Sequence, residues 1–289
     1  MNVPPDEQLA LPADRDLQFL QNDRNRGIRL QLDYEKTEQA LEERNIQHTL
    51  VIFGSTHVVE RSRAEERLAA AEAAHAANPA DETTGLKLKQ ARHLLALGHY
   101  YDEARTLARL VKSKACAKDG SCLAVMTGGG PGIMEAANRG AFESQVPSIG
   151  LNIILPHEQF ANPYLSKGLG FGFHYFAMRK FHFLKRACAL VAFPGGYGTL
   201  DELFEALTLI QTGKMKVIPV VLVGKKYWQS IIDFNALVEF GTIESKDLDL
   251  LIFCETADET WQAIVSWHVK NGSSYFEEFR AEHDSPRLP

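Results

Sequence analysis

Two glycine-rich segments could hold a phosphate group through their backbone amides. Residues 127–134 read TGGGPGIM, and residues 194–199 read PGGYGT. Glycine lets the backbone pass close to a ligand and lets N–H groups converge on it. A helix is predicted to begin behind each segment, and its N-terminus adds partial positive charge. One such loop alone is also an ordinary tight turn, but two at strand ends of one sheet favour a phosphate-binding site.

Neither segment matches a common nucleotide-binding motif. Neither carries the Gly-Lys-Ser/Thr of a Walker loop, and neither fits G-x-G-x-x-G with an acidic residue at the next strand end. A third turn, Gly54-Ser55-Thr56, follows the first predicted strand and is expected near the other two. For this turn an ordinary polar role and a ligand role both remain open.

Several ionisable side chains lie close to these loops in the sequence. Glu202 follows Thr199 by three residues, on the first turn of a helix expected to start there. This spacing fits both a catalytic carboxylate and a capping box, S/T-x-x-E, and leaves the two open. Arg179 and Lys180 lie early in a predicted helix among aromatic residues, where side chains that run along a helix surface are the favoured interpretation. His174 is interpreted as a packed core residue rather than a general base.

Strands and helices alternate from residue 122 onward. The predicted strands are 49–54, 123–127, 148–153, 170–174, 189–193, 217–223 and 250–255. The predicted helices of this part are 132–143, 176–186, 199–211, 227–240 and 258–271. Such alternation predicts βαβ units and a parallel sheet with helices on both faces. Ligands of these folds bind outside the carboxyl ends of the strands, where both glycine segments are expected.

The N-terminal part of the chain lacks this alternation. Residues 33–45 are predicted to form a helix with Asp33 as its N-cap, preceded by an extended or loosely helical arm. A helical insertion is predicted at 61–113, broken by NPADETTG and interrupted near Gly98. The predicted organisation is an arm and helix at 1–45, a main domain at 46–272 that contains the insertion, and a C-terminal tail at 273–289.

The composition of the 289 residues is that of an ordinary globular protein, with 45% hydrophobic and 24% charged residues. The net charge of −6 argues against nucleic acid as the main partner but is compatible with a small phosphate ligand. The N-terminus lacks the basic and apolar regions of a signal peptide, and no apolar run approaches the roughly 20 residues of a membrane helix. A cytoplasmic location with no membrane partner is therefore predicted. The four cysteines lack zinc-ligand spacing and are predicted to be free thiols: Cys116, Cys122, Cys188 and Cys254.

Three segments together resemble the signature of the Lonely Guy (LOG) family of phosphoribohydrolases, long labelled "lysine decarboxylase-like". They read TGGGPGIMEAANRGA at 127–141, MRK at 178–180 and PGGYGTLDE at 194–202. The last segment matches the family motif P-G-G-x-G-T-x-x-E at every fixed position. The resemblance spans residues 49–270, and the arm and insertion look like those of the longer bacterial branch of the family.

The resemblance implies a Rossmann-like α/β fold, with a doubly wound, mostly parallel sheet, an N-terminal helical arm and a helical insertion. It implies Arg179 and Glu202 as the catalytic pair and Lys180 as a supporting cation. Neither a metal nor a cofactor is expected, and a homodimer or larger homo-oligomer is expected. The resemblance also implies a set of residues that hold the ribose and phosphate of the substrate: Ser55, Gly129, Gly130, Gly132, Met134, Glu135, Gly195, Gly196, Gly198 and Thr199.

The predicted reaction is hydrolysis of the N-glycosidic bond of a purine nucleoside 5′-monophosphate to free base and ribose 5-phosphate. The small-molecule partner is AMP or a cytokinin riboside 5′-monophosphate, and the sequence leaves this choice open. A nucleotide sensor or carrier without turnover is the alternative on the same fold. A decarboxylase would need pyridoxal phosphate on a lysine, and no lysine stands in a recognisable cofactor context. The presence of both Arg179 and Glu202 favours the hydrolase.

Overall fold

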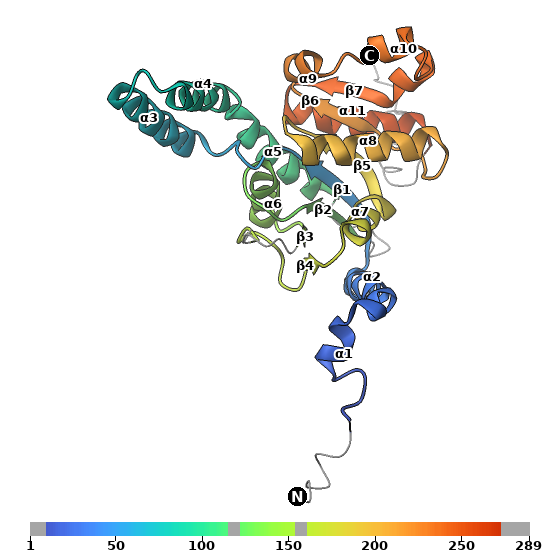
Figure 1. The fold of residues 1–289 in the computed structure, drawn as a ribbon. Coiled ribbons are helices and arrows are strands. Elements are labelled where there is room, and N and C mark those ends of the chain that lie inside the picture. Colours follow the sequence, from blue (N-terminus) through green and yellow to red (C-terminus); the bar gives the residue numbers. More distant parts are fainter. Residues whose placement is uncertain (1–9, 115–121, 154–160, 273–289) are drawn as a thin grey trace, which may run out of the picture.

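The centre of the molecule is a seven-stranded sheet in which each described strand pair is parallel (Figure 1). The computed structural model describes residues 10–114, 122–153 and 161–272. The strand order is β4-β3-β2-β1-β5-β6-β7. The strands are β1 (Ile46–Phe53), β2 (Cys122–Thr127), β3 (Ser148–Ile153), β4 (Gly170–Phe173), β5 (Ala187–Ala192), β6 (Val220–Val223) and β7 (Leu251–Cys254). The predicted strands and the doubly wound α/β fold are confirmed.

The chain reverses its direction of travel across the sheet once. It runs outward from β1 through β2 and β3 to β4, and then crosses back to place β5 on the other side of β1. The carboxyl ends of β1 and β5 therefore flank the point where the strand order reverses. Open α/β sheets bind their ligands in the crevice at this point.

Helices connect the strands and cover both faces of the sheet (Figure 1). They are α1 (Leu17–Gln21), α2 (Arg26–Glu42), α3 (Arg61–Ala77), α4 (Glu82–Ala96), α5 (His99–Leu110), α6 (Ile133–Glu143), α7 (Phe176–Lys185), α8 (Tyr197–Gln211), α9 (Lys225–Ile231), α10 (Phe234–Glu239) and α11 (Ala257–Lys270). The single helix predicted at 227–240 is wrong, because the chain forms α9 and α10 there. The Asp233 carboxylate accepts hydrogen bonds from the backbone N–H groups of Asn235 and Ala236, and so starts a new helix.

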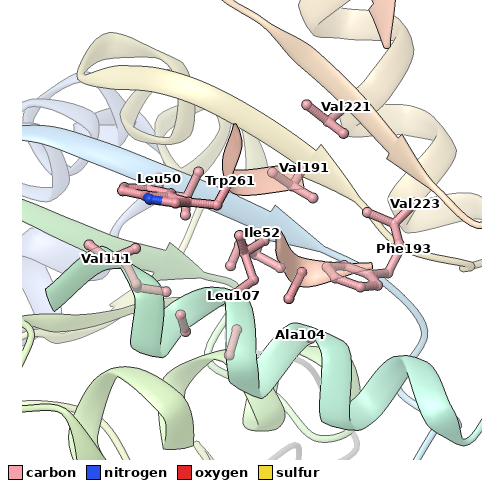
Figure 2. Close-up of a cluster of buried hydrophobic side chains, with 14 of the residues drawn as sticks. Leu50, Ile52, Ala104, Leu107, Val111, Val191, Phe193, Val221, Val223 and Trp261 are labelled. Carbon is pink, nitrogen blue, oxygen red and sulfur yellow. The ribbon is translucent and has the colours of Figure 1, made fainter. Parts of the chain in front are cut away.

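Two apolar layers hold the helices to the sheet. Leu50 and Ile52 of β1 face α5, α6 and α11, whereas Val51 and Phe53 face α7 and α8. This alternation follows from the period of two along a strand, and both faces are apolar because both are covered. Figure 2 shows the first layer, in which α5 lies across the strands with Trp261 of α11 beside it.

The N-terminal arm is anchored on α7, the helix that carries Arg179 and Lys180. Glu38 of α2 is 4% exposed and accepts hydrogen bonds from Arg186 Nη1 at 2.6 Å and Nη2 at 3.0 Å, and from Lys185. Asp33 was predicted to be an N-cap, but α2 begins at Arg26 and Asp33 lies inside it. Its carboxylate instead accepts the His174 N–H at 3.1 Å, on the loop that leads into α7.

The insertion is helical, as predicted, and is made of α3, α4 and α5. The α3–α4 pair stands away from the sheet, whereas α5 packs on it (Figure 1). The helices are interrupted at Leu97 and Gly98, close to the predicted position. The predicted tail at 273–289 and the first nine residues lie outside the described part of the chain.

The cysteines only partly follow the prediction of free thiols. Cys188 and Cys254 are free and buried, and Cys116 lies outside the described residues. Cys122 is disulfide-bonded, so the prediction is wrong at this position. Cys122 is the first residue of β2, and the spacing of the cysteines in the sequence did not predict its disulfide bond. Among the described helices, none combines the length and the apolar character needed to cross a membrane.

Candidate active site

Three loops meet at the carboxyl ends of β1, β2 and β5, which are adjacent in the sheet. The backbone of Ser55, in the turn after β1, connects the other two loops. Its N–H donates to the Pro194 carbonyl at 2.9 Å, and its carbonyl accepts the Ile133 N–H at 3.0 Å. The Ser55 hydroxyl accepts the His57 N–H at 3.0 Å and so closes its own turn. The structure therefore brings Ser55 and both glycine segments together.

The first glycine segment needs its glycines for packing as well as for any ligand. Gly129 and Gly132 have φ values of +70° and +72°, in the left-handed region that favours glycine. A Cβ on Gly132 would overlap the Ser55 carbonyl oxygen, and one on Gly129 would lie 3.1 Å from the Gly150 Cα. These two positions are therefore restricted to glycine even in the absence of a ligand.

A buried polar network fixes the same segment, and the sequence did not predict it. Asn138 of α6 is fully buried, and its Oδ1 accepts from Thr127 Oγ1 at 2.6 Å and from Asn162 Nδ2 at 2.9 Å. Thr127 Oγ1 accepts the Gly129 N–H at 2.9 Å, and Asn162 Nδ2 donates to the Gly130 carbonyl at 3.0 Å. An asparagine on the buried, apolar side of α6 was the available signal, because a buried amide needs partners.

Met134 and Glu135 start α6 behind this segment, and both are half-buried. Met134 reaches back to the loop, since a Cβ on Gly128 would lie 2.8 Å from its sulfur. Glu135 turns toward α5 and accepts a hydrogen bond from the Tyr101 hydroxyl at 3.2 Å. In the described contacts, Met134 therefore touches the glycine segment, whereas Glu135 touches α5.

The second glycine segment leads directly into α8. The N-cap of α8 is Gly196, and no side chain of the described residues caps the helix, so its first N–H groups point to the loop. A Cβ on Gly195 would overlap Thr199 Oγ1, whereas one on Gly196 or Gly198 would meet nothing within 4 Å. Gly195 is thus required by packing, while Gly196 and Gly198 border open space. An anion could approach the backbone there, with favourable helix-terminal charge.

Arg179 extends from α7 toward the first glycine segment. Its guanidinium carbon lies 5.6 Å from the centre of the Phe176 ring and 5.2 Å from that of Phe183. A Cβ on Gly128 would lie 3.2 Å from Arg179 Nη2. Burial lowers the pKa of Arg179, against the opposing effect of Glu202. Its Nε is buried and has no hydrogen-bond partner among the described residues, so the surface interpretation of Arg179 is wrong.

Glu202 is 4% exposed on the inner side of α8. Burial raises the pKa of its carboxyl to about 7, although Lys180 and Arg179 oppose the rise. Its Oε2 accepts no hydrogen bond from the described residues and lies 3.5 Å from Lys180 Nζ. The capping-box interpretation of Thr199 and Glu202 is wrong, because α8 starts two residues before Thr199 and Glu202 is buried. A buried carboxyl with a raised pKa and an oxygen that accepts no hydrogen bond from the described residues is typical of functional sites.

His174 and one cavity lie outside the two glycine segments. His174 is exposed and packs against Tyr175, so its interpretation as a core residue is wrong. A cavity of about 1080 Å³ lies beside α7 and α8 at the amino ends of β1 and β5, away from the glycine loops. Lys180 and Glu205 line this cavity, whereas Glu202, Arg179 and the glycine segments do not. Within the described residues, no group of three His, Cys, Asp or Glu side chains could hold a metal ion.

The fold and this edge define a class: a Rossmann-like α/β protein with two glycine loops, a half-buried arginine and a buried glutamate at the switch point of its sheet. The sequence model of the family described as "Possible lysine decarboxylase" matches residues 134–264. Two Arabidopsis thaliana proteins, the cytokinin riboside 5′-monophosphate phosphoribohydrolases LOG3 and LOG4, are each 37% identical over 83 residues. These matches cover 28% of this chain and 38% of each relative, so the chain spans less than half the length of either.

Among solved structures, the molybdenum cofactor binding protein of the phototrophic bacterium Rippkaea orientalis is 19% identical, with a TM-score of 0.40. That match covers 58% of this chain and 86% of the other. The family model and the two plant relatives each match part of the chain, and together they support a LOG-family, Rossmann-like protein. The match with the family model contains α7, α8 and the second glycine segment, and thus Arg179, Lys180 and Glu202.

Proposed function

We propose that the chain hydrolyses the N-glycosidic bond of purine nucleoside 5′-monophosphates and releases free base and ribose 5-phosphate. The observation that carries the proposal is the buried Glu202 carboxyl. Its unpartnered Oε2 and the Arg179 guanidinium lie at the edge where the two glycine loops meet. The related plant proteins are phosphoribohydrolases by name, which supports the same reaction class.

The geometry supports a different role for each of these groups. The open backbone at Gly196 and Gly198 would hold the 5′-phosphate, and that remote binding would position C1′ of the ribose. Breaking the bond to the base nitrogen builds oxocarbenium character on the ribose. Glu202, as a carboxylate, would stabilise this positive charge and direct a water molecule to C1′. Arg179 keeps its proton at neutral pH and would donate hydrogen bonds to the sugar or to the leaving base.

The first test measures base release from a panel of nucleoside 5′-monophosphates by chromatography, with the matching nucleosides as controls. We expect adenine from AMP or an N6-substituted adenine from a cytokinin riboside 5′-monophosphate, and no release from the free nucleosides. The more active of the two substrates would define the specificity. Tight binding of a monophosphate by folded protein, without release of any base, would instead establish a sensor or carrier.

Gly198→Ala is expected to weaken substrate binding without harming the fold. A methyl group at this position meets no atom of the described residues within 4 Å, so we expect it to intrude on a bound phosphate rather than on the fold. We expect a KM about ten- to a hundredfold higher, equivalent to roughly 1.5–3 kcal/mol of charge-assisted hydrogen bonding. The matched control is Gly27→Ala in α2, where a Cβ also meets nothing within 4 Å. An unchanged KM in Gly198→Ala would place the phosphate elsewhere.

We also propose that two copies of the chain associate through the outer surface of α7 and α8. Four large side chains of these helices are exposed: Phe176 at 51%, Phe181 at 46%, Tyr197 at 92% and Phe204 at 39%. Exposed apolar surface of this kind is typical of interaction sites. A partner there would lie beside Arg179 and Glu202.

Phe204→Asp is therefore expected to convert the protein from a dimer or larger assembly into a monomer, because a charge would be buried in the interface. Light scattering coupled to size-exclusion chromatography measures the mass directly. The control is Phe240→Asp, since Phe240 is 83% exposed directly after α10 and lies outside this surface. A mass that is the same for wild type and Phe204→Asp would argue against an interface on α7 and α8.

A further inference from the structure

The Lys180 ammonium lies among three carboxylates of α8. Its Nζ is 2.7 Å from Glu205 Oε2 and 2.8 Å from Asp201 Oδ2, but 3.5 Å from Glu202 Oε2. Asp201 and Glu205 are four residues apart and share one side of the helix, so a single cation can contact both. The Lys180 side chain is 16% exposed, which keeps the ammonium close to these acids.

The two shorter contacts of the Lys180 ammonium are made with Asp201 and Glu205 rather than with Glu202. The charge of Lys180 is already balanced by Asp201 and Glu205, and Glu202 Oε2 accepts no hydrogen bond among the described residues. If the ammonium moved to hydrogen-bond distance from Glu202, it would occupy that oxygen and stabilise the ionised form. A carboxylate oxygen has two lone-pair sites, so a lysine at that distance would fill one of them and lower the basicity of the oxygen toward the attacking water.

We propose that Asp201 and Glu205 are positioning residues that hold the Lys180 ammonium away from Glu202 and keep Glu202 Oε2 free to receive the attacking water. This role rests on the hydrolytic function proposed above. Four charged groups act on Glu202: Lys180 and Arg179 from α7 favour its ionised form, and Glu205 and Asp201 from α8 oppose it. Asp201 and Glu205 thus affect the pKa of Glu202 in two ways: directly through their charge, and indirectly because they fix the position of the Lys180 ammonium.

The test measures the pKa of Glu202 itself, by NMR of carboxyl-labelled glutamate, with Glu202→Gln to assign the signal. In Asp201→Asn/Glu205→Gln, Lys180 loses its other partners and should move to Glu202. We expect the pKa of Glu202 to fall by about one unit or more, as beside an opposite charge at close range. Asp249→Asn removes one exposed acid outside this group and should leave the signal in place.

The loss of two negative charges lowers the pKa of Glu202 even if Lys180 does not move. The same pair of substitutions is therefore made in a Lys180→Met background, where only this direct effect remains. The proposal requires a clearly larger fall in the presence of Lys180, and equal falls in both backgrounds would overturn it. If the double variant does not fold, Asp201→Asn alone is measured in both backgrounds, because the Asp201 side chain is 59% exposed.

Turnover provides a second and separate readout. The limb of the kcat/KM profile that reports ionisation of Glu202 should move to lower pH in Asp201→Asn/Glu205→Gln, together with a lower kcat. The NMR measurement needs no turnover, so it tests the place of Lys180 even if no monophosphate is hydrolysed. An NMR shift with an unchanged kcat would overturn the positioning role, because Lys180 would then reach Glu202 without consequence.

Discussion

Glu202→Gln is expected to release base about 10²–10⁴-fold more slowly than the wild type, which is the usual contribution of a positioned acid–base group. The amide keeps the shape of the side chain but can neither carry negative charge nor accept a proton at neutral pH. The measurement is base release from the best monophosphate under saturating conditions. The control is Glu239→Gln, because Glu239 is exposed at the end of α10. Wild-type turnover in Glu202→Gln would remove this residue from the mechanism.

The same substitution is expected to stabilise the protein above pH 7. The pKa of Glu202 is about 7 in the folded chain against an ordinary value of 4.5, so the folded state holds this proton more tightly. Its contribution to stability is complete below pH 4.5 and is lost as the pH rises through 7. A buried, charged Glu202 at pH 9 then costs about 3 kcal/mol that a neutral glutamine does not. Denaturant unfolding at pH 5 and pH 9 tests this expectation, and equal stabilities at pH 9 would contradict it.

Glu38→Ala is expected to have the largest effect on stability. Glu38 is buried between α2 and α7 and pairs with both Lys185 and Arg186. Removal of one member of a buried ion pair leaves the others uncompensated and typically costs about 3–5 kcal/mol. Urea unfolding at neutral pH measures the loss. The control on the same helix is Glu42→Ala, whose side chain is 65% exposed and lies 3.9 Å from Arg186.

The stability lost in Glu38→Ala should depend on pH in the opposite sense from the stability contribution of Glu202. Burial alone would raise the pKa of Glu38, but hydrogen bonds and charge from Arg186 and Lys185 outweigh burial and hold the pKa below its ordinary value. Its contribution to stability is therefore present above the unfolded pKa of 4.5 and is lost as the pH falls through the lower folded pKa. Wild type and Glu38→Ala should converge in stability in acid. A constant difference between them down to the lowest measurable pH would show that packing, not charge, explains the loss.

The place of the site could be predicted from the sequence because two strong local signals agree. Alternation of apolar strands and helices predicted the parallel sheet, and glycine-rich turns marked the strand ends that face the crevice. The structure adds the order of the strands, which makes β1, β2 and β5 neighbours. That order depends on contacts between segments far apart in the chain, which no local pattern encodes.

The state of individual side chains could not be predicted in the same way. Thr199 and Glu202 have the spacing of a capping box, but α8 starts earlier and turns Glu202 inward. In the sequence Arg179 has the pattern of a surface residue, whereas in the structure Phe176 and Phe183 lie beside its guanidinium. Burial and pKa both depend on tertiary neighbours, so spacing along one helix leaves such alternatives open.

Two main-chain hydrogen bonds of Ser55 connect the three loops. Substitution of the Ser55 side chain leaves both bonds to Pro194 and Ile133 in place, since every residue except proline supplies the same N–H and carbonyl. The side chain at position 55 can therefore change while the loops stay connected, whereas Gly132 and Gly195 beside it cannot gain a side chain without a shift of their neighbours.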